Sequence, residues 1–426
     1  MMAFLLFGVL FILLFLGVPI GISMGMSVLT ALFLGGVRIP AMVVAQRMFT
    51  AIDSFPFMAV PFFILAGDLM QRGGVSEKLI QFIRQVCFWI PAHLGVITVV
   101  ASGFFGAISG SNPATVAAIG GIMIPEMQKA GYPAAKASAI AAAGGTLGVI
   151  IPPSISMITY ALVASVSVGT MFVGGIVPGI LLMIAMSILV GISCRKYEFD
   201  QNYEITWKSV LSAFIEATWA LIMPLIILGG IYGGVFTPTE AAAVACVYAF
   251  VVSKFVYKEL EYKDLPAIFA KSATSTALVL FIVAVSSSFS WLMTSSGVPA
   301  QITKFLLGSF SSKYVIFLMV NASLLFLGCF LETQSIILLM TPIVLPICVH
   351  LGMDPIALGL IMIINTSIGM ITPPMAVNLY VASSISGVSI ESISRNIVPL
   401  FLVLTFMLFL FTYCPGILMF LPNMLQ

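Results

Sequence analysis

Two short polar stretches interrupt strongly apolar parts of the sequence. The first, within "AISGSNPATVAAIGG", carries Ser109, Ser111 and Asn112, and the second, within "FLGCFLETQSIILLM", carries Glu332 and Thr333. Hydroxyl, amide, carboxyl and free carbonyl oxygens are hard ligands that suit a small alkali cation. Glu332 has no basic neighbour in sequence, so it has either a role at this polar stretch or a purely structural hydrogen bond.

A second pair of interruptions follows the first. The stretches "AAAGGTLGVIIPPS" and "IINTSIGMITPPM" place a proline pair after a Gly-rich or Asn/Thr/Ser-rich segment. A proline pair in a helix interior removes hydrogen bonds, so we expect both helices to unwind there. Unwound carbonyls with the hydroxyls of Thr146, Thr366 and Ser367 are further cation ligands, and half-helix N-termini suit an anionic substrate.

The composition places these breaks inside a membrane. The chain has 426 residues, of which 61% are hydrophobic and 8% charged, with a mean hydropathy of +1.19. Apolar runs long enough for a spanning helix recur along it, so we predict an all-α polytopic membrane protein with a retained first helix. Six scattered cysteines and two histidines indicate no metal or haem site, no cofactor is implied, and the small net charge indicates no nucleic-acid partner.

Two kinds of element would position these residues. A re-entrant hairpin holds a polar tip between two short apolar arms, because irregular backbone at membrane depth must be buried or line a cavity. We predict such hairpins at about 98–127, with Gly110 at the turn and Pro113 starting the second arm, and at about 314–347. Broken helices are predicted at about 137–160 and 356–380.

The sequence also indicates an internal duplication. Four landmarks recur at an offset of 221 residues: Pro125 and Pro346, Gly148 and Gly369, Pro152 and Pro373, Pro178 and Pro399. We therefore predict a first repeat over 1–192, a polar junction or surface helix over 193–217, and a second repeat over 218–426. Duplicated helical membrane proteins are very often secondary transporters with inverted repeats and a substrate site between broken helices.

Four stretches carry a family resemblance: "FFGAISGSNPATVAAIGGIMIPEM", "AAGGTLGVIIPPSI", "GGVFTPTEAAAVA" and "NTSIGMITPPMAVNLYVA". Together they resemble the large membrane subunit (DctM-like, SiaM-type) of the tripartite ATP-independent periplasmic (TRAP) transporters. The resemblance implies a sodium-coupled symporter in the bacterial inner membrane, surrounded by lipids, with an elevator architecture similar to the ion-transporter superfamily. A periplasmic binding protein would deliver an organic acid, and a small membrane subunit would scaffold the large one.

The resemblance also implies site residues. The sodium positions by motif matching are Ser109, Ser111, Asn112, Gly145, Thr146, Gly148, Glu332, Thr333, Thr366, Ser367 and Gly369. The substrate positions are Ser111, Asn112, Pro153, Thr333, Pro374 and Asn378. Sialic acid and C4-dicarboxylates are both in the family range, and overall resemblance leans to sialic acid.

Other functions stay open on the residues alone. The alternatives are a membrane-embedded enzyme acting on lipid-linked substrates, a stand-alone carboxylate/sodium symporter and a passive channel. An enzyme would need clustered intramembrane His, Asp or Arg, which are scarce here.

Charged residues outside the breaks have simpler interpretations. Thr237, Pro238 and Glu240 predict a capping box at a helix start. Asp68 accompanies the amphipathic stretch 73–95, predicted as a surface helix. Basic residues around two loops indicate a cytoplasmic location by the positive-inside rule: Arg195, Lys196 and Lys208, then Lys254, Lys258, Lys263 and Lys271.

Overall fold

The computed structural model describes residues 2–35, 40–87, 89–90, 92–195, 197, 207–310 and 312–425. These residues form 21 α-helices joined by turns and short 3₁₀ or π segments, and no strand occurs among them. Six helices are long and apolar enough to cross a bilayer within these ranges, and the bent pair Met42–Ile52 with Phe55–Arg72 adds a seventh when counted as one span. The predicted all-α membrane fold is confirmed.

The first half of the chain runs from two short helices to a long one. Its helices are α1 (Met2–Phe15), α2 (Ile20–Leu34), α3 (Met42–Ile52), α4 (Ala59–Arg72), α5 (Val75–Cys87), α6 (His93–Ser109), α7 (Asn112–Thr115), α8 (Gly121–Lys129), α9 (Ala134–Gly144), α10 (Ile155–Ala164) and α11 (Val168–Ser193). The region predicted as the first hairpin comprises α6, α7 and α8. The region predicted as the first broken helix comprises α9 and α10, separated by a 3₁₀ turn over Gly145–Val149.

The second half repeats this order. Its helices are α12 (Trp207–Tyr232), α13 (Pro238–Val251), α14 (Leu265–Ser295), α15 (Val298–Ser309), α16 (Lys313–Gly328), α17 (Thr333–His350), α18 (Pro355–Gly369), α19 (Val377–Ser386), α20 (Ile390–Tyr413) and α21 (Gly416–Met424). Helices α16 and α17 form the second hairpin, and α18 with α19 form the second broken helix. The unbroken α14 takes the place of α3 and α4, whose 62° bend the sequence did not predict.

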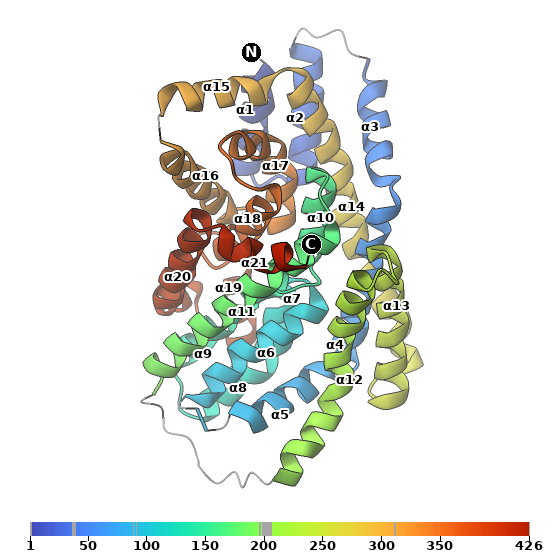
Figure 1. Cartoon of the computed structure of the whole chain (residues 1–426), viewed down its shortest axis with the longest axis vertical. Helices are drawn as coiled ribbons and strands as arrows, with labels where there is room; N and C mark the ends of the chain where they lie inside the picture. The colour runs from blue at the N-terminus through green and yellow to red at the C-terminus, as the bar shows by residue number, and fades with distance from the viewer. Residues whose placement is uncertain are drawn as a thin grey trace.

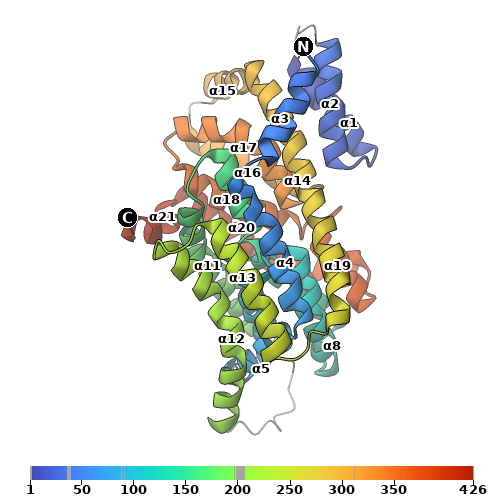
Figure 2. The ribbon, with the colours of Figure 1, turned by 90° about the vertical axis from the view of Figure 1, so that its right-hand side faces the viewer.

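Helices of the two repeats combine into two layers. One layer contains α1–α4 and α12–α14, which pack on one another and face the viewer in Figure 2. The other layer contains the hairpins, the broken helices, α11 and α20, and the large buried side chains Phe105, Tyr160 and Phe172 lie in it. The equivalent helices α5 and α15 lie at opposite ends of the molecule (Figure 1), as inverted repeats require.

Local sequence explains where the breaks occur. Helix α6 ends at Gly110, which has a φ of +59° that glycine adopts without a side-chain clash. Pro113 lies in the first turn of α7, where its missing N–H costs nothing. The predicted capping box at Thr237 and Glu240 is confirmed at the start of α13.

The polar junction predicted over 193–217 is not a separate surface helix in its described part. Residues 207–217 form the first turns of α12, which continues as one helix to Tyr232. Apolar sequence follows the polar turns without a helix-breaking glycine or proline until Pro224, so the helix propagates through them. Lys196 and residues 198–206 of the junction lie outside the described residues.

Each hairpin touches its broken helix through a pair of glycines. A Cβ built on Gly106 would lie 2.9 Å from the Gly148 Cα, and one built on Gly369 would lie 2.4 Å from the Gly328 Cα. The contact is therefore backbone against backbone, and any side chain would push the two elements apart. The same packing in both repeats shows that the duplication extends to the core.

We expect Gly369→Ala to destabilise the fold by about 1–3 kcal/mol, because the added methyl has no space and the backbone of α16 must move. Thermal unfolding of the purified protein in detergent measures this. Gly121→Ala is the matched control, since a Cβ at Gly121 meets nothing within 4 Å. Equal unfolding temperatures for the two variants would contradict the tight contact.

Candidate functional site

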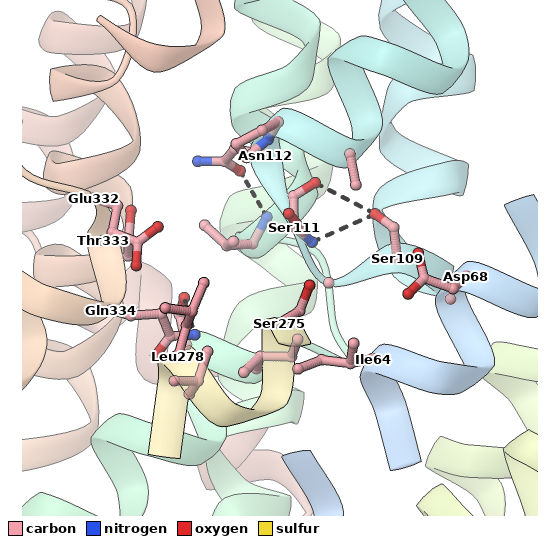
Figure 3. A pocket seen from close by; sticks show the side chains of 18 of the residues that line it. Ile64, Asp68, Ser109, Ser111, Asn112, Ser275, Leu278, Glu332, Thr333 and Gln334 are labelled. Carbon is pink, nitrogen blue, oxygen red and sulfur yellow. Dashed lines mark hydrogen bonds between the residues drawn. The ribbon is translucent and has the colours of Figure 1, made fainter. Parts of the chain in front are cut away.

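The two hairpin tips meet at one cavity. The tip between α6 and α7 contributes Ser109, Ser111 and Asn112, and the tip between α16 and α17 contributes Glu332 and Thr333. Helices α4 and α14 of the other layer close the cavity from the side, with Ile64, Asp68, Ser275 and Leu278 labelled in Figure 3. Its volume is about 300 Å³, which is at the lower end of the range for small-molecule sites.

The first tip holds a cluster of oxygen atoms. The Ser109 Oγ lies 2.9 Å from the Thr115 Oγ1, and the Thr115 hydroxyl donates to the Ser111 carbonyl at 2.8 Å. Gly148 of the 3₁₀ turn lies directly against them, because a Cβ there would fall 2.5 Å from the Ser111 carbonyl oxygen. Neutral hydroxyl and carbonyl oxygens thus converge where the hairpin meets the broken helix.

Asn112 connects the first tip to both broken helices. Its side chain is fully buried, its Oδ1 accepts a hydrogen bond from the Val149 N–H at 3.0 Å, and its Nδ2 donates to the Ser367 Oγ at 3.2 Å. The Nδ2 also lies 3.4 Å from the Met370 Sδ. One amide therefore joins residues from both repeats, and Ser367 is brought to the first tip.

The second tip differs in its chemistry. Glu332 precedes the first residue of α17, but its side chain makes no capping hydrogen bond and no ion pair among the described residues. It borders the central cavity and a second, apolar cavity near Phe330, and the residue is exposed. The Thr333 hydroxyl lies 3.5 Å from the Met370 Sδ, and Gln334 donates to the Ser156 Oγ at 3.2 Å.

The broken helices lie behind the tips. The Thr146 and Thr366 hydroxyls donate to carbonyls of their own helices, at 2.6 Å to Ala143 and 2.8 Å to Met362, which leaves their lone pairs as acceptors. Asn378 donates to the Ala142 carbonyl at 3.2 Å and lies beside Gly145. These three side chains are fully buried and do not line the cavity.

The two prolines predicted as substrate contacts occupy different places. Pro153 is buried, and its carbonyl oxygen lies 3.3 Å from the position of a Cβ on Gly110, directly behind the first tip. Pro374 is exposed. Neither proline is among the residues that line the cavity.

The cavity is also lined by residues that the sequence analysis did not predict there. Asp68 of α4 was interpreted as accompanying a surface helix, and Lys271 of α14 as part of a cytoplasmic loop. Both line the cavity and form an ion pair with 2.6 Å between Oδ1 and Nζ. Ser272 donates to the other Asp68 oxygen at 2.6 Å. A carboxylate within the apolar stretch of α4 was a usable signal for Asp68, whereas Lys271 lies 203 residues away and only folding brings it there.

Comparisons with known proteins agree with this architecture. A family model described as "Tripartite ATP-independent periplasmic transporter, DctM component" matches residues 7–417. The C4-dicarboxylate TRAP transporter large permease protein DctM of Rhodobacter capsulatus is 39% identical, over all of both chains. The isethionate TRAP transporter permease protein DctMQ of Oleidesulfovibrio alaskensis is 41% identical over 90% of this chain and 60% of its own length. The sialic acid TRAP transporter large permease protein SiaM of Vibrio cholerae is 33% identical over 89% of each.

Solved structures share the fold at low sequence identity. The YdaH transporter of Alcanivorax borkumensis aligns with a TM-score of 0.61 at 14% identity, covering 88% of this chain and 87% of that chain. MtrF of Neisseria gonorrhoeae aligns with a TM-score of 0.58 at 12% identity, covering 88% and 84%. These likenesses show the fold alone.

The fold, the central site and the named relatives together define a multi-pass membrane permease of the inner membrane, and not an enzyme. The chain belongs to the DctM family, the large permease component of the tripartite ATP-independent periplasmic transporters. The family resemblance predicted from the four sequence stretches is confirmed.

We expect Asn112→Ala to lower the stability of the protein by about 1–3 kcal/mol, because the buried Val149 N–H loses its acceptor and Ser367 loses its donor. Thermal unfolding in detergent is the measurement. Asn396→Ala serves as the control, since Asn396 donates only to a carbonyl of its own helix. An unfolding temperature that falls no further for Asn112→Ala than for the control would show that the tip is held in another way.

Proposed function

We propose that the chain is the large subunit of a sodium-coupled transporter that imports an organic acid. A periplasmic binding protein would deliver the acid, and a small membrane subunit would support the permease. The observation that carries the proposal is the meeting of two hairpin tips, one from each repeat, at a single cavity beside the α4 and α14 layer. Inverted repeats with a central site are the usual architecture of secondary transporters.

Sodium coupling is supported by the kinds of atoms at the breaks. The oxygens of Ser109, Ser111 and Thr115 are neutral and close together, and Thr366 and Ser367 offer hydroxyls behind the tips. Neutral oxygen atoms beside breaks in the helices are suitable ligands for an alkali cation, because they can replace the water molecules around it. Thr115 joins the set of candidate ligands, although spacing alone did not select it.

The substrate class is an organic anion. The relatives described above are named for C4-dicarboxylates, isethionate and sialic acid, which share a carboxylate or sulfonate group. The predicted leaning to sialic acid has no support from identity, since the C4-dicarboxylate permease is the more similar of the two. Measuring which of these anions the partner binding protein binds would identify the substrate.

The partners follow from the relatives. The DctMQ permease extends well beyond the part that this chain matches, which leaves room for a fused small subunit. We infer that the present chain pairs with a separate small subunit, and its exposed apolar side chains on α12 and α13, such as Leu225 and Val247, fit a membrane environment of lipid and protein.

An elevator movement suits the two layers. Both hairpins and both broken helices pack as one body with α11 and α20, and the tips reach across to α4 and α14 through the cavity. We infer that this body slides against α1–α4 and α12–α14, carrying the cavity between the two membrane sides. We infer from the basic residues near Lys254 and Lys263, by the positive-inside rule, that the Lys271 end of α14 is cytoplasmic and that the cavity opens to that side.

The function is tested in proteoliposomes that contain both membrane subunits, with the binding protein added outside. Thr115→Val removes a hydroxyl from the first tip, and Glu332→Gln removes the ionisable carboxyl group from the second, while both keep the side-chain shape. We expect each to raise the sodium concentration for half-maximal uptake by about fivefold, as loss of one ligand worth about 1 kcal/mol would do.

Thr98→Val is the control, because the buried Thr98 hydroxyl donates to the Leu94 carbonyl of its own helix, away from the tip. Sodium dependence that stays at the wild-type level in both tip variants would refute the sodium sites. Uptake without any binding protein would instead indicate a stand-alone symporter.

The elevator movement is tested by cross-linking in a background without the six native cysteines. A Gly169→Cys, Ile231→Cys pair joins α11 to α12, since a Cβ at Gly169 lies 3.3 Å from the Ile231 Cγ2. We expect oxidation to abolish uptake and reduction to restore it, because the disulfide ties the moving body to the static layer.

A pair within the moving body is the control. A Cβ at Gly120 lies 3.4 Å from the Ala141 Cβ, close to the usual disulfide separation, so Gly120→Cys with Ala141→Cys should form a disulfide and leave uptake intact. Full uptake with the α11–α12 disulfide formed would exclude sliding and favour local gating at the tips.

A further inference from the structure

The cavity holds a single basic side chain among the described residues that line it. The hairpin tips contribute Glu332 and neutral groups, whereas the one cation, Lys271, comes from α14 in the other layer. An organic anion therefore finds no positive side chain on the body that would carry it. Its charge partner in this structure lies on the layer that stays in place.

Lys271 is held in position and still has a donor to spare. Its Nζ lies 2.6 Å from the Asp68 Oδ1 and 3.4 Å from the Gln71 Oε1. The Lys271 side chain keeps 61% of its surface exposed, against 12% for Asp68. An ammonium has three N–H donors, so one remains for a ligand in the cavity after these two contacts.

The other end of the same layer carries a second basic side chain, held by a residue at the position equivalent to Asp68. An offset of 223 residues maps the ends of the α3–α4 segment, Met42 and Arg72, onto the ends of α14, Leu265 and Ser295. Under this offset Asp68 corresponds to Trp291, and Lys271 corresponds to Met48, the neighbour of Arg47.

Arg47 contacts Trp291, the residue equivalent to Asp68, through the ring face and not through an ion pair. The Arg47 guanidinium lies 5.2 Å from the centre of the Trp291 ring, within the range of a cation–π interaction. Arg47 is exposed, and its guanidinium carries five N–H donors. The Lys271–Asp68 and Arg47–Trp291 contacts thus lie toward opposite ends of the α3–α4 and α14 pair, and Asp68 and Trp291 are equivalent positions. The Lys271 end also carries Arg72, which pairs with Asp264.

We propose that Lys271 and Arg47 are alternate anion contacts, one at each end of the path along which the cavity moves. This inference rests on the proposed function. Lys271 contacts the carboxylate or sulfonate when the cavity opens to the cytoplasmic end, and Arg47 does so when it opens to the opposite end. Because Lys271 belongs to α14 and not to the hairpin body, this contact breaks when the cavity moves away from it.

The test measures anion affinity separately on the two sides. Proteoliposomes contain the complete complex with binding protein outside only, so that complexes with the periplasmic face outward are the ones that run. Succinate, isethionate and sialic acid are tried as the transported anion. Efflux from vesicles loaded at graded concentrations gives half-saturation on the cytoplasmic side, and uptake gives it on the outer side.

We expect Lys271→Gln to raise the half-saturating concentration on the cytoplasmic side by about tenfold or more and to leave the outer value unchanged, because a charge-assisted hydrogen bond is lost on one side only. Arg47→Gln should do the reverse. Lys271→Arg should stay within about threefold of the wild type. Lys263→Gln is the matched control, because Lys263 is exposed, pairs with Glu261 and does not line the cavity.

A purely structural ion pair would behave differently. If Lys271 only neutralises Asp68, the double variant Asp68→Asn, Lys271→Gln would recover the wild-type affinity, and that result would overturn the proposal. If Lys271 binds the anion, the double variant stays impaired and Asp68→Asn alone does not weaken cytoplasmic affinity. Unchanged affinities in Lys271→Gln would also overturn it while the proposed function stands. A wild-type complex without sodium-dependent flux would overturn both.

Discussion

The buried amide of Asn112 is the interaction on which the centre of the molecule depends. It lies at the start of a short helix after a tight turn, and its two polar atoms join the Val149 N–H of one broken helix and the Ser367 hydroxyl of the other. A buried amide must satisfy both ends, so the tip has one stable position relative to both repeats. The hydrogen bonds of Asn112 therefore help to fix the shape of the cavity between the tips.

The duplication is symmetric in backbone and asymmetric in chemistry. Glycine pairs let each hairpin touch its broken helix in the same way, because only glycine allows backbones this close. The tips nevertheless present hydroxyls and an amide on one side and a carboxylate on the other. The two repeats therefore have similar backbone packing but contribute different functional groups to the central cavity.

Charge is divided between the two layers of the DctM-family fold. Glu332 lies on the hairpin body, and the pair of Asp68 and Lys271 lies on the layer beside it. Charges interact more strongly beside apolar helices than in bulk water, so the position of these groups affects where an anion binds. The layer that forms the wall of the cavity is therefore also part of its recognition chemistry.

The sequence by itself determined the membrane class and the family. It also predicted the repeats, the two hairpins and the two broken helices, because glycine, proline and polar residues within apolar runs act on the local backbone. It also selected Ser109, Ser111, Asn112, Glu332 and Thr333, all of which line the cavity. Only the tertiary structure decided which residues face them. Lys271 contacts Asp68, and Trp291 contacts Arg47, across more than 200 residues of sequence, and local patterns carry no information about partners that packing brings together over that separation.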